Sequence, residues 1–184
     1  MSSVYGITKQ ISLLISKLSD VNNLEIEAKI RKIDASDFEL LRDLLSSRFE
    51  KLDSYTVDYY VKESRITEDN GKYIDTSKIN KFEEILGMGN KSIKFNVSTE
   101  ESKLVTREEI SGYDFKREKE RISFVDGNLR IDLTKVTRSK EVNYEFELEI
   151  INPKKYNERE FGDKITFYFN VINEYILNTV SFCN

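Results

Sequence analysis

Glutamates recur at every second position in two segments of this 184-residue chain. The segment 24–30 alternates apolar residues with Glu25 and Glu27, and the segment 144–150 alternates them with three more glutamates. Successive side chains of a β-strand point to opposite faces, so each segment would present a row of carboxylates on one face. Like charges on one face repel each other. A bound divalent cation, which prefers oxygen ligands, would offset that repulsion.

Basic residues follow the same alternation elsewhere in the chain. Arg117, Lys119 and Arg121 would share one face of a strand. Lysine and arginine at such spacing bind phosphate, and acidic and basic walls facing each other are what a metal-assisted reaction on a polyphosphate requires. Two further strands would each present a mixed polar face, with Lys94, Asn96, Ser98 and Glu100 on one and Arg130, Asp132 and Thr134 on the other.

Composition excludes several other kinds of chemistry. The chain has no histidine, so imidazole metal sites and the nucleophilic systems that use histidine as a base are ruled out. It has one cysteine, Cys183, which excludes a disulfide framework and a cysteine-based zinc site. The net charge of −4 does not fit a basic nucleic-acid clamp.

The elements that must position these residues are mainly strands. The pattern predicts strands at 24–30, 55–67, 72–75, 91–99, 103–110, 114–125, 128–137 and 144–150. Asn70-Gly71 and Asp126-Gly127 are hairpin signals between such runs. At least eight strands with few helices predict a mainly β (α+β) fold, an antiparallel closed β-barrel.

Three segments have helical spacing. We expect an N-terminal helix within residues 1–20, a helix over 36–49 opened by a Ser36–Glu39 capping box, and a C-terminal helix over 163–181 capped by Asp163. The chain length fits a single domain. No segment resembles a targeting peptide or approaches the roughly 20 apolar residues of a membrane span, so we expect an intracellular protein.

Each charged strand alone is more typical of a solvated sheet face with cross-strand ion pairs. Their combination favours a site inside the barrel, with the apolar faces turned outward against the helices.

The segments also resemble a known family. Leu24-Glu-Ile-Glu-Ala-Lys29 is similar to the ExExK strand of the triphosphate tunnel metalloenzymes. Three further segments resemble, in order and spacing, the metal-dependent RNA 5′-triphosphatases of fungal and viral mRNA capping: Arg117–Ser123, Arg130–Val136 and Glu145–Ile150. Weaker central matches are Thr56–Asp58, Ser64–Thr67 and Lys94–Glu100. The resemblance implies a tunnel-shaped barrel that removes the γ-phosphate from the 5′-triphosphate end of RNA, with an NTPase side activity.

The same resemblance implies roles for individual residues. A Mg²⁺ or Mn²⁺ ion would be bound by Glu25, Glu27, Glu147 and Glu149, with Glu145 in the same wall. Glu100 would orient the attacking water. The triphosphate would be held by Arg65, Lys94, Arg117, Lys119 and Arg121, with Asp58 and Asp132 fixing basic side chains.

One position departs from the family pattern. The family has a phosphate-binding lysine where this chain has Thr76, and Lys78 lies two residues further along on the same strand face. We therefore expect Lys78 to supply that charge. The resemblance further implies an mRNA guanylyltransferase partner, as a separate chain or a fused domain. It also implies a location in the nucleus of a eukaryote or in a cytoplasmic viral factory or virion.

Two other functions remain open from the sequence. One is a different tunnel phosphohydrolase, such as an inorganic or thiamine triphosphatase, or an adenylate cyclase. The other is a non-catalytic module that binds polyphosphate or nucleotide, although such a module has little use for so many glutamates.

Overall fold

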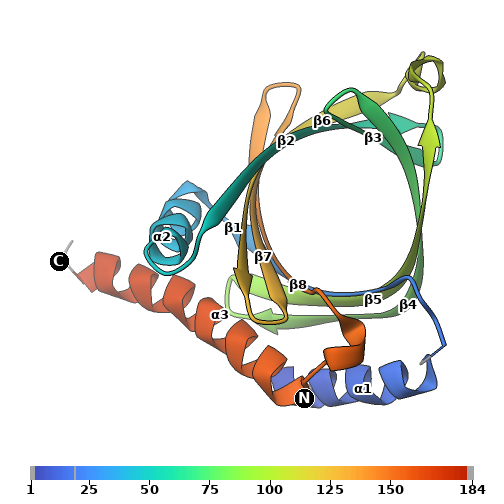
Figure 1. Ribbon diagram of the computed structural model, residues 1–184. Helices are drawn as coiled ribbons and strands as arrows, with labels where there is room; N and C mark the ends of the chain where they lie inside the picture. The colour runs from blue at the N-terminus through green and yellow to red at the C-terminus, as the bar shows by residue number, and fades with distance from the viewer. Residues whose placement is uncertain (1–2, 19, 182–184) are drawn as a thin grey trace.

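In the part of the chain that the structure describes, the strands form a closed antiparallel barrel with three helices outside it (Figure 1). The computed structural model describes residues 3–18 and 20–181, so Cys183 lies outside the described residues. The barrel order is β1-β5-β4-β3-β2-β6-β7-β8. The strands are β1 (Leu24–Ile33), β2 (Lys51–Val61), β3 (Ser64–Asp69), β4 (Lys72–Met88), β5 (Lys91–Val105), β6 (Phe115–Asp126), β7 (Leu129–Arg138) and β8 (Glu141–Ile150). The predicted fold class is confirmed.

The two predicted hairpins are present. Asn70 and Gly71 form the two-residue turn between β3 and β4, with φ of 49° and 76°. Gly127, at φ 64°, begins the turn between β6 and β7. These left-handed conformations favour glycine and asparagine, which is why the sequence predicts both turns.

Other strand boundaries differ from the prediction. The segment 55–67 is not one strand, because the chain turns between β2 and β3 at Lys62, a residue with φ 55°. The segment 72–75 is only the start of the 17-residue β4. The predicted strand 103–110 is also wrong, since β5 continues to Val105 and a 3₁₀ turn follows at Arg107–Ile110.

The helices are α1 (Val4–Lys17), α2 (Ala35–Ser46) and α3 (Glu158–Ser181). The capping box of α2 is formed by Asp34 and Asp37, each side chain accepting the other's backbone N–H, rather than by Ser36 and Glu39. The helix therefore begins and ends earlier than predicted.

The start of α3 was also predicted too late. The side chain of Asn157 accepts the backbone N–H groups of Arg159 and Glu160, so the helix begins at Glu158. Asp163 lies inside it and accepts a 2.6 Å hydrogen bond from the Tyr5 hydroxyl, which joins α3 to α1.

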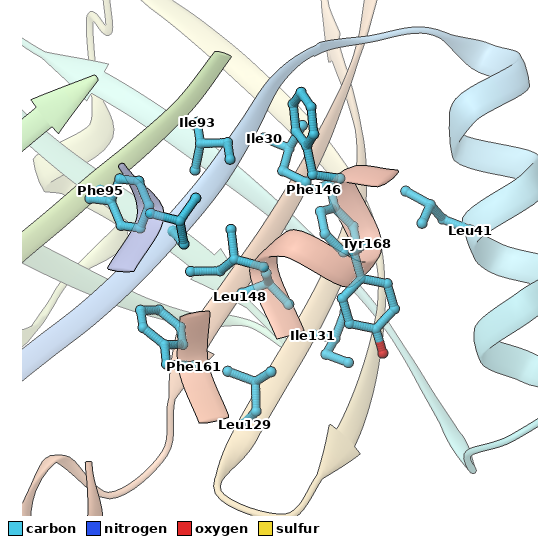
Figure 2. Packing of buried hydrophobic residues seen from close by; sticks show 14 of the residues in the cluster. Ile30, Leu41, Ile93, Phe95, Leu129, Ile131, Phe146, Leu148, Phe161 and Tyr168 are labelled. Carbon is cyan, nitrogen blue, oxygen red and sulfur yellow. The ribbon is translucent and has the colours of Figure 1, made fainter. Parts of the chain in front are cut away.

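The hydrophobic core lies outside the barrel, between its wall and the helices. Figure 2 shows Ile30, Phe146 and Leu148 from the barrel wall close to Phe161 and Tyr168 of α3, all of them buried. Burying a side chain of this size contributes about 1.5–3 kcal/mol each. Because the apolar faces of β1, β5, β7 and β8 are used in this way, their polar faces turn into the barrel.

Candidate active site

The polar faces of the strands enclose one cavity of about 510 Å³. Every site residue predicted from the sequence lines this cavity except Asp132, which is buried behind it. The residues on its wall are Glu25, Glu27, Asp58, Arg65, Lys78, Lys94, Glu100, Arg117, Lys119, Arg121, Glu145, Glu147 and Glu149. Strand alternation and closure of the sheet thus bring together groups that are up to 124 residues apart (Glu25 to Glu149).

The acidic wall forms where β1 and β8 adjoin. Glu27 and Glu149 are direct cross-strand partners, and Glu25 follows on the same face of β1. Lysines and arginines already contact several of these oxygens. Lys78 lies 2.5 Å from Glu25, and Arg130 lies 2.5 Å from Glu149.

Crowding and burial change the acidity of this wall. Burial raises the pKa of Glu149 to about 7, against the opposing effect of Arg130. Burial and the neighbouring Glu147 also raise the pKa of Glu27. Glu147 itself behaves differently: burial acts to raise its pKa, but its ion pair with Lys29 lowers it overall.

The shift at Glu149 predicts a pH dependence of stability. A carboxyl whose folded pKa is raised to about 7 from an ordinary 4.5 contributes stability at pH 6 that is lost as the pH rises through 7. Metal-free protein should therefore lose about 1.4 kcal/mol of unfolding free energy between pH 6 and pH 8 through this group. Urea unfolding in EDTA at both pH values measures the loss. Glu149→Gln should remove most of it, and an unchanged loss in that variant would show that another group is responsible.

The donor set of the acidic wall fits a hard divalent cation. It consists of carboxylate oxygens, and the raised pKa values of Glu27 and Glu149 reflect unfavourable negative charge that a cation would relieve. As arranged among the described residues, however, no three acidic side chains lie close enough to hold one ion. The oxygens of Glu25 and Glu149 are turned to Lys78 and Arg130 instead, so a cation would have to displace these contacts.

A second wall, on β6 and its neighbours, is basic and reaches the acidic wall, since Arg117 lies 2.7 Å from Glu145 of β8. Arg117, Lys119 and Arg121 point into the cavity from alternate positions of β6. Burial lowers the pKa of Lys119, and the positive charges of Arg121 and Arg65 lower it further against the opposing effect of Asp58. A buried nitrogen of Arg65, Nε, has no hydrogen-bond partner among the described residues. Such a concentration of half-buried positive charge favours an anionic ligand.

Two buried aspartates position these cations. Asp58 accepts a 2.8 Å hydrogen bond from the Thr67 hydroxyl and lies 2.7 Å from Lys119. Asp132 accepts from the Ser123 hydroxyl at 2.7 Å, from Arg130 at 3.1 Å, and lies 3.4 Å from Arg121. Both are about 1% exposed, so almost all of the surface of each is covered by its protein neighbours.

The remaining predicted residues lie between the two walls. Glu100 and Lys78 are cross-strand partners, and their charged groups lie 3.2 Å apart. Lys94 lies 2.9 Å from Glu83 of β4.

Some residues of the cavity were not predicted as site residues. Lys29 forms ion pairs with both Glu145 and Glu147, and Arg130 joins Glu149 to Asp132. The sequence did carry a signal for both, because each alternates with predicted site residues on its own strand. Their ion pairs depend on which strands adjoin, which the sequence pattern does not give.

In the part of the chain that the structure describes, no helix is long and apolar enough to cross a membrane.

Similarity to solved structures agrees with this geometry. The fold matches the RNA triphosphatase Pct1 of S. pombe with a TM-score of 0.69 and 18% sequence identity, over 96% of this chain and 91% of that one. It matches the RNA triphosphatase domain of the mimivirus mRNA capping enzyme with a TM-score of 0.68 and 18% identity, over 90% of this chain and 95% of that one. A comparison with curated protein sequences finds no match.

The fold matches show the fold of this chain, and a family model shows the family to which its sequence belongs. The model described as "mRNA capping enzyme, beta chain" matches residues 88–179, which is half of the chain and includes β5 to β8. The glutamates of β1 lie outside the matched range, and the closed barrel places them against β8. The chain belongs to the family of mRNA capping enzyme beta chains.

Proposed function

We propose that this protein hydrolyses the γ-phosphate from the 5′-triphosphate end of nascent RNA, the first step of mRNA cap formation. The observation that carries the proposal is one cavity of about 510 Å³ that holds both the carboxylates of β1 and β8 and the half-buried cations of β6. A triphosphate requires both walls, because its oxygens need cations and its cleavage uses a metal ion. Membership of the capping family favours RNA as the substrate.

The acidic wall is the proposed metal site. Mg²⁺ or Mn²⁺ would be held by Glu25, Glu27, Glu147 and Glu149, with Glu145 adding negative charge. When bound, the ion neutralises γ-phosphate oxygens and draws charge from the reacting phosphorus.

The basic wall is the proposed triphosphate site. Arg65, Lys94, Arg117, Lys119 and Arg121 would hold the phosphate oxygens and stabilise the charge that grows in the transition state. Glu100 would orient the attacking water and accept its proton. Water attacks the γ-phosphorus as the bond to the β–γ bridging oxygen breaks, so inorganic phosphate leaves and the RNA keeps a diphosphate end. The side chains of this cavity include no cysteine or histidine for a covalent intermediate.

Three substrates distinguish this function from its alternatives. Phosphate release should be measured with Mg²⁺ and with Mn²⁺ on 5′-triphosphate RNA, inorganic tripolyphosphate and thiamine triphosphate. We expect the highest kcat/KM for RNA. A preference for tripolyphosphate or thiamine triphosphate would indicate another tunnel phosphohydrolase, and binding without release from any substrate would indicate a non-catalytic module. Release from ATP would report the NTPase side activity.

The replacement of the family lysine by Thr76 gives a further prediction. Positions 76 and 78 lie on one face of β4, about 6.6 Å apart along the strand. A lysine stem spans much of this distance, whereas a threonine hydroxyl offers only a neutral hydrogen bond. Lys78→Ala should therefore lower kcat on RNA at least tenfold, about 1.4 kcal/mol of transition-state stabilisation. Steady-state kinetics measure the change.

The matched control is Lys154→Ala, an exposed lysine on the 3₁₀ turn after β8, which should leave kcat unchanged. Moving the charge back in Thr76→Lys/Lys78→Ala should restore much of the loss. A silent Lys78→Ala would mean that the other cations suffice and that Lys78 serves only to neutralise Glu25 and Glu100.

Capping also requires a guanylyltransferase, and we propose that it acts as a separate chain or a fused domain that receives the diphosphate RNA end. The place of action follows from the source: the nucleus for a eukaryotic protein, a cytoplasmic viral factory or virion for a viral one.

A further inference from the structure

One end of the barrel carries a stack of aromatic and cationic side chains that the proposed hydrolysis does not use. The rings of Tyr60 and Phe115 lie 4.4 Å apart and within 14° of parallel. The guanidinium carbon of Arg138 lies 4.0 Å from the centre of the Phe115 ring. Arg117, which lines the cavity, donates a 3.3 Å hydrogen bond to the Tyr60 hydroxyl.

Strand register places this stack next to the basic wall. Tyr60 is the cross-strand partner of both Phe115 on β6 and Arg65 on β3. Phe115 precedes Arg117 by two residues, so it lies on the same face of β6, about 6.6 Å nearer the end of the strand. The stack therefore forms a rim just outside the outermost cations of the proposed triphosphate site.

The other end of the barrel has a different character. Arg130 and Arg138 are eight residues apart on β7, so about 26 Å of strand separates the two ends. A second hollow at the Arg130 end is lined by Glu25, Glu100 and Glu149, with Arg130 as its basic residue. The three carboxylates there outnumber Lys78 and Arg130, the two cations paired with them, and would repel the phosphodiester backbone of an RNA chain. At the opposite rim the Arg138 guanidinium attracts that backbone, and flat groups offer surfaces on which a base can stack.

From this asymmetry we propose that the RNA leaves the cavity past Tyr60, Phe115 and Arg138. Tyr60 and Arg138 come from the two strands that flank β6 and cover the Phe115 ring, so the base of the first nucleotide stacks on the exposed guanidinium plane of Arg138. The inference rests on the proposed function and adds to it the direction of the substrate and a site for the base. One ribose separates a 5′ base from its α-phosphate, a span comparable with the 6.6 Å between Phe115 and Arg117. Every base has a flat face, so such a rim accepts any first nucleotide.

The test compares RNA with a substrate that has no base. Stacking of one base on a flat side chain contributes about 1–3 kcal/mol. Phe115→Leu keeps bulk but removes the ring that holds the Arg138 guanidinium plane in place, and it should raise KM for 5′-triphosphate RNA about tenfold. Hydrolysis of inorganic tripolyphosphate should be unchanged, because that substrate does not reach the rim.

The matched control is Phe167→Leu on α3, outside the barrel. Phe167 also faces an arginine, since the Arg48 guanidinium carbon lies 5.7 Å from its ring centre. The Phe167→Leu variant should hydrolyse both substrates with unchanged KM. Where Phe115→Leu fails to fold, Arg138→Gln serves instead, since Arg138 is exposed at a strand end; it should raise KM for RNA several-fold.

The outcomes separate this inference from the proposed function. An equal effect on RNA and tripolyphosphate, or no effect on either, would overturn the base site while leaving the hydrolysis intact. Wild-type protein that hydrolyses tripolyphosphate but not triphosphate RNA would instead overturn the proposed function.

Discussion

Glu27→Ala should abolish phosphate release from triphosphate RNA, with a loss of at least about 10³-fold in kcat, the upper range for removing one charge-stabilising group. Glu27 lines the cavity and is the direct cross-strand partner of Glu149, so its loss removes an oxygen ligand from the proposed metal site. Glu149→Ala should have a comparable effect. Steady-state kinetics at saturating Mg²⁺ or Mn²⁺ measure both variants.

The fold should survive these changes. The raised pKa of Glu27 means that its charged form is disfavoured in the metal-free folded state, so above that pKa its removal relieves a cost instead of emptying a core. Metal-free Glu27→Ala should have a melting temperature no lower than the wild type at pH 8. Glu101→Ala, an exposed neighbour of Glu100 on β5, is the matched control and should retain full activity. Near wild-type turnover in Glu27→Ala would mean that the metal site lies elsewhere.

Lys119→Ala should lower kcat on RNA about 10²-fold, about 2.7 kcal/mol of transition-state stabilisation. The Nζ atom of Lys119 lies 2.7 Å from a carboxylate oxygen of Asp58 and close to other cations. Burial lowers its pKa, so the charged form of Lys119 is disfavoured in the folded protein. A phosphate group bound beside it would offset that cost most in the transition state, where negative charge grows. The effect should therefore appear in kcat, with unchanged affinity for Mn²⁺.

Two variants check the assignment of Lys119. Lys116→Ala alters an exposed lysine of the same strand, which pairs with Glu118, and should have no effect. Asp58→Ala should lower kcat, and adding it to Lys119→Ala should cost little more because the two act as a unit. Independent, additive losses would show that Asp58 does not act through Lys119.

Much of the fold follows from local patterns in the sequence. The alternation in 24–30 and 144–150 identifies β1 and β8, because one face of each packs against helices and the other turns into the polar cavity. Where a strand lacks this contrast, the pattern fails. In β4 the outward Ile79 is 59% exposed, and a bulge between Asn80 and Phe82 reverses the alternation, so that Ile85 pairs with the cavity residue Lys94; the sequence therefore does not show how far the strand extends.

The candidate site was predictable to a similar extent. The alternation of side chains along each strand identifies which of them share a face, and the structure brings the polar faces into one cavity. Which groups contact each other depends on strand order and register, which link β1 to β8 and β2 to β6. The Lys29–Glu147 ion pair and the Tyr60–Phe115 stack arise in this way, so neither could be predicted from the sequence.

The most direct test of the proposed activity uses two RNA substrates that carry a radioactive phosphate at different positions. One carries ³²P only in the γ-phosphate of its 5′-triphosphate, and the other carries it only in the β-phosphate. With Mg²⁺ or Mn²⁺, the protein should release the label of the first as inorganic phosphate and leave the label of the second on RNA with a diphosphate end. Release of the β label, or retention of the γ label at saturating metal, would contradict the proposed triphosphatase activity.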